Sequence, residues 1–278
     1  MTDHPLRGKF IVNACLTGMV GRRHHNPSLP VTVEKVARDA EAVIALGAAM
    51  IHVHARDENE EPDWRPEPYQ QIVRAVRAVS EEVIVCVSTS GRKVADVERR
   101  TACLDIDPRP DMASLTLGSL NFLREGVVNS PQTVRALAER MRALGVRPEL
   151  EIFDVGMARA AARLIDEGLV PRPAYANILL GNAGSASTAP ADLAAILAHL
   201  PADLVRSIAG IGGEQLRANL LGLVHAQGVR VGLEDNLFLD ARKTPASNAA
   251  LVERVVRLGR ELGLEPATPR EVRAALAL

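Results

Sequence analysis

Short runs of Val, Ile and Leu alternate along the chain with longer segments whose apolar residues recur at the spacing of a helix. Successive runs begin about 20 to 40 residues apart, which is typical of βα units that build a parallel sheet. We predict eight strands, at residues 10–14, 50–54, 83–88, 112–116, 149–153, 175–180, 204–209 and 229–233.

The segments between these runs predict amphipathic helices. Thr32 supplies a hydroxyl that can cap a helix over residues 32–47, and Gly47 ends it. Pro66 stands near the first turn of a second helix, over residues 66–80, a position that tolerates proline. The other predicted helices cover residues 130–145, 189–200 and 213–228.

Eight strands with intervening helices predict a (β/α)8 barrel of the TIM type, formed by residues 1–278 as a single domain. The rival fold is a doubly wound open sheet, whose first strand favours a following GxGxxG turn. Residues 15–27, which follow the first predicted strand, read CLTGMVGRRHHNP and contain no such turn. The barrel is therefore the favoured fold.

Charge and composition exclude several classes of protein. Lys and Arg number 33 and Asp and Glu number 34, whereas nucleic-acid-binding proteins usually carry a basic excess. No apolar stretch reaches the ~20 residues of a membrane span, and the N-terminus lacks the apolar core of a signal peptide. We therefore expect a cytoplasmic protein that binds neither nucleic acid nor membrane. Cys15, Cys86 and Cys103 are widely spaced, and we expect them to be reduced core thiols.

Candidate metal ligands lie at the ends of two predicted strands. His52 and His54 are two residues apart, so the alternation of a strand turns both imidazoles to one face. Glu234 ends the last strand, and in a closed barrel both strands flank the first one. Such donors with an open position are typical of catalytic Zn2+, although Co2+, Ni2+ or Mn2+ also suits them. The alternatives are a hydrogen-bonded pair of core histidines and a buried structural pair of Glu234 with Arg230.

Other polar residues follow strand ends, where barrel enzymes place their active sites. Asp235 is a candidate general base that Arg230 would orient and keep ionised; alternatively, Asp235 and Asn236 cap the next helix. Gly232, between Arg230 and Glu234 on one face, would leave room for a ligand or a neighbouring side chain. The candidates for substrate binding are Asn13, Ser88, Thr116 and Glu149.

Two further features are less specific. Residues 181–186 and 210–214 contain small residues that could let backbone amides approach an anion, but tight turns are the simpler interpretation. His24 and His25, in the long loop after the first strand, could touch substrate or be solvated.

Several motifs at the predicted strand ends occur together in one chain: NACLTG at 13–18, HVHARD at 52–57, STSGR at 88–92, MASLTLGSLNF at 112–122 and VRVGLEDNLFL at 229–239. Together they resemble the β-keto acid cleavage enzymes, nearly from end to end. The resemblance implies a (β/α)8 barrel with a divalent metal, usually zinc, held by His52, His54 and Glu234. It also implies acetyl-CoA and a β-keto acid as substrates, and a homo-oligomer that tends to be a tetramer.

The family reaction implied by this resemblance converts a β-keto acid and acetyl-CoA into acetoacetate and the CoA ester of the remaining acyl fragment. Asp235, oriented by Arg230, would take the C2 proton of a keto acid that is polarised by the metal. Ser88 and Thr116 would hold oxygen atoms during condensation, and retro-Claisen cleavage would release acetoacetate. The residues leave other functions open: an aldolase or decarboxylase that needs no CoA, a metal-dependent hydrolase, and a non-catalytic binding barrel.

The loop after the first strand departs from the pattern of members that cleave 3-keto-5-aminohexanoate. In those members the stretch after the first strand resembles TGAEV, and its Glu receives the substrate's amino group. This chain instead has Met19 and Val20 after Gly18. Loss of that counter-charge at a partly desolvated site would cost on the order of 1–3 kcal/mol or more. We therefore predict that Met19 and Val20 face a keto acid with a neutral or anionic side chain.

Overall fold

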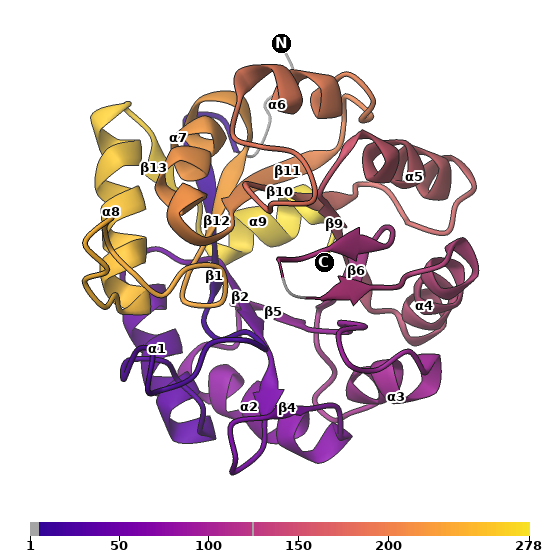
Figure 1. The fold of residues 1–278 in the computed structure, drawn as a ribbon, viewed down its shortest axis with the longest axis horizontal. Helices are drawn as coiled ribbons and strands as arrows, with labels where there is room; N and C mark the ends of the chain where they lie inside the picture. The colour runs from indigo at the N-terminus through magenta and orange to yellow at the C-terminus, as the bar shows by residue number, and fades with distance from the viewer. Residues whose placement is uncertain (1–5, 124) are drawn as a thin grey trace.

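Eight parallel strands form a closed barrel at the centre of the computed structural model, which describes residues 6–123 and 125–278 (Figure 1). β12 pairs with β1 and closes the barrel, and β2 flanks β1 on its other side. This arrangement confirms the predicted TIM-type fold. The barrel strands are β1 (Lys9–Cys15), β2 (Met50–Val53), β5 (Ile84–Val87), β6 (Met112–Thr116), β9 (Arg147–Ile152), β10 (Tyr175–Leu180), β11 (Val205–Gly210) and β12 (Gly228–Val231).

Helices surround the barrel and turn their apolar faces towards the strands. Side-chain oxygens of Thr32 and Ser130 accept hydrogen bonds from the first turns of α1 and α4, as N-caps do. The structure also has helices α3, α5 and α8, which are not among the helices predicted from the sequence. The helices are α1 (Val33–Ala45), α2 (Pro66–Val79), α3 (Val97–Thr101), α4 (Pro131–Leu144), α5 (Val155–Asp166), α6 (Pro190–Leu197), α7 (Gln215–His225) and α8 (Asn248–Glu261), with 3-10 turns at Ala102–Leu104 and Gly212–Glu214.

Two short hairpins stand on the loops that leave the carboxyl ends of the strands. One pairs β3 (Ala55–Arg56) with β4 (Pro62–Asp63), and the other pairs β7 (Leu120–Asn121) with β8 (Gly126–Val127). Figure 1 views the barrel from this end, which carries the candidate site residues.

The amino end of the barrel is closed by the last segment of the chain. β13 (Glu265–Pro266) pairs with β1, and α9 (Pro269–Leu276) lies across the end of the barrel, behind the strands in Figure 1. Val272 and Leu276 of α9 pack with Met50 and Tyr175 in a buried apolar cluster. The barrel therefore has an apolar floor, which the strand pattern does not predict.

The buried residues include all three cysteines, which are free thiols as predicted. Among the described helices, none has both the length and the apolar character needed to cross a bilayer.

Gly232 leaves room for neighbouring protein groups, which is the second of the two roles that the sequence left open. A Cβ at this position would overlap the carbonyl oxygen of Cys15 on β1 and approach Asn248 Oδ1 to 3.0 Å. The space that glycine leaves is thus occupied by the neighbouring strand rather than by a ligand. The close approach also lets Glu234 N–H donate to the Cys15 carbonyl at 3.2 Å, which fixes the chain just before the candidate ligand.

Replacing Gly232 with alanine should destabilise the fold, because β12 and β1 must separate to admit the methyl group. We expect Gly232→Ala to lower the free energy of unfolding by about 1–3 kcal/mol or more in urea titrations. Gly213→Ala is the matched control, because its Cβ would meet nothing within 4 Å. Equal stability of the two variants would contradict the assignment.

Candidate active site

The candidate metal ligands meet at the carboxyl end of the barrel. His52 is on β2, His54 follows that strand, and Glu234 follows β12. His54 Nε2 lies 3.1 Å from Glu234 Oε1, His52 Nε2 lies 3.5 Å from Glu234 Oε2, and the two Nε2 atoms are 3.4 Å apart. Three potential donor atoms from distant parts of the sequence therefore converge on one point.

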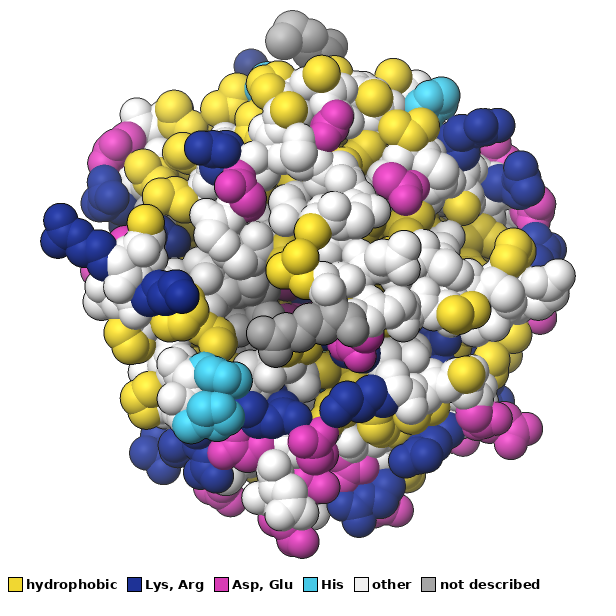
Figure 2. All heavy atoms as spheres, viewed as in Figure 1, with side chains coloured by type: hydrophobic (Ala, Val, Ile, Leu, Met, Phe, Trp, Pro, Cys, Tyr) yellow, Lys and Arg dark blue, Asp and Glu magenta, His cyan; other side chains and the backbone are white. Residues whose placement is uncertain are grey.

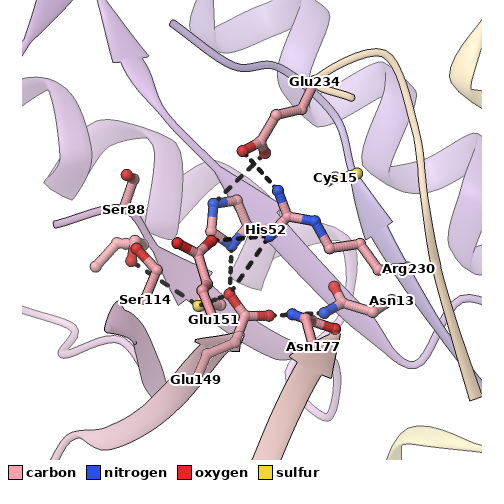
Figure 3. A network of polar contacts seen from close by, with 12 residues as sticks. Asn13, Cys15, His52, Ser88, Ser114, Glu149, Glu151, Asn177, Arg230 and Glu234 are labelled. Carbon is pink, nitrogen blue, oxygen red and sulfur yellow. Dashed lines mark hydrogen bonds and ion pairs between the residues drawn. The ribbon is translucent and has the colours of Figure 1, made fainter. Parts of the chain in front are cut away.

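A buried polar network holds His52 from below. Glu149 Oε2 lies 2.7 Å from His52 Nδ1, and Glu149 Oε1 accepts a hydrogen bond of 2.7 Å from Asn13 Nδ2 (Figure 3). The Cys86 thiol donates to Glu149 Oε2 at 3.1 Å. Because Nδ1 is engaged by a carboxylate, the ring is oriented with Nε2 towards Glu234.

Arg230 joins the carboxylates at this end of the barrel. Its Nη2 donates to Glu234 Oε1 at 2.6 Å, and its Nε and Nη2 donate to the two oxygens of Asp235 at 3.0 and 3.2 Å. Nη1 reaches Glu151 Oε1 at 3.2 Å and lies 3.8 Å from Glu149 Oε2. The guanidinium is almost completely buried, so these four acids share one cation that solvent hardly screens.

The charges of the site shift its pKa values in opposite directions. Burial lowers the pKa of His52, but the carboxylates of Glu234 and Glu149 outweigh it and raise this pKa to about 9. Burial raises the pKa of Glu149, yet His52 and Arg230 bring it down to about 2. For His54, burial dominates and lowers the pKa. The acids thus attract positive charge to this point of the barrel, as a proton on His52 or as a metal ion.

Two groups of side chains among the described residues could hold a metal ion: His52 with His54 and Glu234, and His52 with Cys86 and Glu149. The first group fits better. Glu234 Oε2 is buried and has no hydrogen-bond partner in the described structure, so it has a free lone pair for a cation. Burial raises the pKa of the Cys86 thiol well above its usual range, which disfavours the thiolate that a metal requires.

The other predicted residues fall into two layers. Asn13 and Glu149 are completely buried and contact protein groups beneath His52, so they do not face an open substrate site. Ser88 and Thr116 lie higher, at the ends of β5 and β6. Thr116 Oγ1 donates to Glu151 Oε2 at 2.6 Å, and Ser88 Oγ accepts from the Ser90 N–H at 3.1 Å, which leaves its own proton available.

The loop after β1 separates the two residues predicted to face the substrate side chain. Met19 is buried with Trp64 and Val94 in a small apolar cluster, whereas 60% of the Val20 surface is exposed. The loop nevertheless adjoins the site, because a Cβ on Gly18 would approach Glu234 Cγ to 2.6 Å. His24 and His25 are exposed further along the same loop, with ring centroids 3.9 Å apart.

Several residues of the site were not predicted. Cys15 donates its thiol hydrogen to Asp235 Oδ2 at 3.2 Å. The Tyr175 hydroxyl accepts from Asn13 Nδ2 at 3.2 Å and contacts Asn177 Oδ1 and Ser207 Oγ at 3.0 and 2.8 Å. The alternation of side chains along a strand could have predicted these contacts. Tyr175 and Asn177 are two residues apart on β10, so their polar groups lie on the same face and point into the barrel.

Comparison with known proteins gives concordant matches over nearly the whole chain. A protein-family model described as beta-keto acid cleavage enzyme matches residues 9–278. A 3-keto-5-aminohexanoate cleavage enzyme from Fusobacterium nucleatum is 36% identical over 272 residues, which cover 97% of this chain and 98% of the relative. A 3-oxoadipate:acetyl-CoA acetyltransferase from Cupriavidus necator is 34% identical over 272 residues, which cover 96% of this chain and 94% of the relative.

Among solved structures, apo ObcA superposes with a TM-score of 0.79 at 21% identity. The match covers 91% of this chain and 66% of that longer chain, and it supports the barrel fold.

Removing the charge of Arg230 should destabilise the protein. In Arg230→Met, Glu234 and Asp235 would stay buried without their cation, so the free energy of unfolding should fall by about 3–5 kcal/mol in the presence of a metal chelator. The control is Arg257→Met, which breaks a solvent-exposed pair with Glu261 and should leave stability nearly unchanged. A similar small effect in both variants would show that Arg230 does not stabilise the acids.

Proposed function

The chain belongs to the beta-keto acid cleavage enzyme family, and from this premise we propose that it cleaves a β-keto acid with acetyl-CoA, giving acetoacetate and the CoA ester of the remaining fragment. A relative named as an acetyl-CoA acetyltransferase and another named as a keto acid cleavage enzyme support this activity. The observation that carries the proposal is the convergence of two imidazoles and a carboxylate beside the buried Arg230–Asp235 pair at the barrel mouth.

We assign the metal-binding role to His52, His54 and Glu234. Two imidazoles and a carboxylate, with Glu149 behind His52, suit zinc, although Co2+, Ni2+ or Mn2+ also suits such a set. When bound, the metal supplies a Lewis acid that polarises the ketone of the keto acid.

Asp235 is the general base of the proposed reaction. Arg230 holds both carboxylate oxygens of Asp235, and the Cys15 thiol donates to one of them, so the side chain has a fixed orientation. An oriented carboxylate at the mouth is suited to remove the C2 proton of the keto acid, which leaves a carbanion that attacks the acetyl-CoA carbonyl. CoA would then pass from the acetyl carbon to the other carbonyl of the condensed product, and retro-Claisen cleavage would release acetoacetate and the new CoA ester.

Ser88 binds a substrate oxygen in this proposal, because no acceptor among the described residues takes its hydroxyl proton. Thr116 stands at the end of β6 and binds a second oxygen if its hydroxyl turns from Glu151 Oε2 to the substrate. Glu149 and Asn13 act as positioning residues instead, because their contacts lie with His52 and Tyr175 beneath the site.

The side chain of the keto acid lies towards Val20 and is neutral or anionic, whereas Met19 packs against Trp64 and Val94 and does not face it. The exposure of Val20 reduces the electrostatic penalty expected from the sequence, because exposed charge pairs typically contribute only ~0.2–1 kcal/mol. The preference against an aminated substrate is therefore several-fold rather than absolute.

The assembly is a homo-oligomer, tetrameric as the family tends to be, and the enzyme acts in the cytoplasm. Leu220 and Val224 support association, since they are exposed one turn apart on α7, with 41% and 62% of their surfaces accessible.

Metal content distinguishes the two possible ligand groups. After dialysis against Zn2+ and removal of free ions, we expect about one ion per chain in the wild type. His54→Ala and Glu234→Gln should lose it, whereas Cys86→Ser should keep it, as measured by elemental analysis. Glu149→Gln should bind zinc about 10–100-fold more weakly. Retention in His54→Ala together with loss in Cys86→Ser would place the metal in the other group.

The reaction itself is tested with β-keto acids of neutral, anionic and amino-substituted side chains, with and without acetyl-CoA. We expect CoA-ester formation and acetoacetate release that require acetyl-CoA. Asp235→Asn should reduce kcat by about 10²–10⁴-fold while retaining the unfolding profile and metal content of the wild type.

Equal turnover without acetyl-CoA would instead indicate an aldolase or decarboxylase. Comparable kcat/KM values for 3-keto-5-aminohexanoate and an uncharged analogue would contradict the assignment of Val20 to side-chain selection.

A further inference from the structure

A groove of about 650 Å³ opens between the loop that follows β10 and the start of α7, apart from the candidate metal ligands. This volume is in the range of small-molecule sites. We infer that the groove binds the pantetheine arm of acetyl-CoA, an assignment that rests on the proposed function and adds the location of its thioester substrate. The residues that carry the argument are Asn182, Ala183, Ser185, Glu214 and Arg217.

A backbone hydrogen bond connects the turn beside the groove to the segment that carries the candidate base. The groove is lined by Gly181 and Glu214, which belong to neighbouring loops at the carboxyl ends of β10 and β11. The Gly212 N–H, in the 3-10 turn that carries Glu214, donates to the Asp235 carbonyl oxygen at 2.7 Å. A thioester chain lying in this groove would thus approach the barrel mouth beside Asp235, where the proposed carbanion forms.

The lining mixes apolar and polar groups and is largely uncharged, which matches the alkyl segments and the two amides of a pantetheine arm. Within the described residues, the Ala183 N–H donates to no protein acceptor, and Ser185 Oγ accepts from Asn182 Nδ2 at 3.1 Å but gives its own proton to no protein group. Asn182 Oδ1 likewise receives no protein donor there. Free donors and a free acceptor therefore stand together, as recognition of an amide requires.

Charge complementarity favours the arm over the phosphates of CoA inside the groove. Glu214 is a lining carboxylate, and its Oε2 accepts from Thr188 at 2.5 Å and pairs with Arg217 at 3.1 Å. One acid thus balances one base, and no net positive charge remains for a phosphate. Figure 2 shows the area between α6 and the centre of the view mainly in white, whereas charged side chains gather on the opposite rim.

The loop that lines the groove is braced, so the site exists before any ligand binds. Asn182 Nδ2 donates to the Asn121 carbonyl oxygen at 3.0 Å, and a Cβ on Gly184 would approach the same oxygen to 2.5 Å. The loop therefore rests directly on the β7–β8 hairpin. A preformed groove loses less entropy on binding than a mobile loop.

Filling the groove tests the assignment. Ala183 is exposed in the groove, and Ala183→Phe should raise KM about tenfold or more for both acetyl-CoA and acetyl-pantetheine, which lacks the nucleotide. The KM for the keto acid and the metal content should stay at wild-type values. Ala195→Phe, at an exposed position of α6 outside the groove lining, is the matched control and should change neither KM.

Calorimetric titration with CoA separates this assignment from the proposed function. If the wild type binds no CoA and turns over no keto acid with acetyl-CoA, the proposed function fails. If the wild type binds CoA and Ala183→Phe binds it equally well, the groove assignment alone is overturned. A KM increase for acetyl-CoA without one for acetyl-pantetheine would also overturn it, because the nucleotide would then occupy the groove.

Discussion

The buried guanidinium of Arg230 is the interaction on which the candidate site depends. Four carboxylates from β9 and from the end of β12 point towards the interior of one barrel, and Arg230 contacts all of them within 3.8 Å. Burying those acids without a cation would oppose folding. The acid excess that Arg230 does not neutralise raises the pKa of His52 and makes the barrel mouth attractive to a further positive charge. The same electrostatics therefore stabilises the fold and prepares it for a metal.

The polar side chains inside the barrel form two layers, which have different structural roles. In the lower layer, buried hydrogen bonds link Asn13 to Glu149 and to Tyr175, and Glu149 holds His52 in one orientation. In the upper layer, Glu234 keeps an oxygen without a hydrogen-bond partner in the described structure. A buried hydrogen-bond network orients the groups that it links, whereas a buried carboxylate oxygen without a partner is unfavourable until a cation reaches it. The lower layer thus fixes the orientation of His52, and the upper layer leaves a carboxylate oxygen of Glu234 available to a cation.

Much of this architecture follows from short-range patterns in the sequence. The strands, the shared face of His52 and His54, and the neighbouring position of Glu234 are consequences of strand alternation and barrel closure. The role of Glu149 does not follow, because it depends on a distance across the barrel between residues 97 positions apart. At Gly232 the sequence pattern left open a ligand or a neighbouring side chain, and the structure has the Cys15 carbonyl group and the Asn248 side chain there. The floor made by α9 and the groove beside α7 arise from long-range packing, which local periodicity does not encode.

The apolar floor of the barrel has a kinetic consequence. Because α9 and β13 close the amino end, both substrates and both products must pass through a single mouth. In the proposed arrangement the keto acid binds deep, against Arg230 and His52, and the thioester binds in the groove at the rim. A thioester bound at the rim would block access to the deeper site. We therefore expect the keto acid to bind before acetyl-CoA. For the same reason, the new CoA ester should dissociate before acetoacetate. The helix that completes the core would in this way determine the order of events at the opposite end of the barrel.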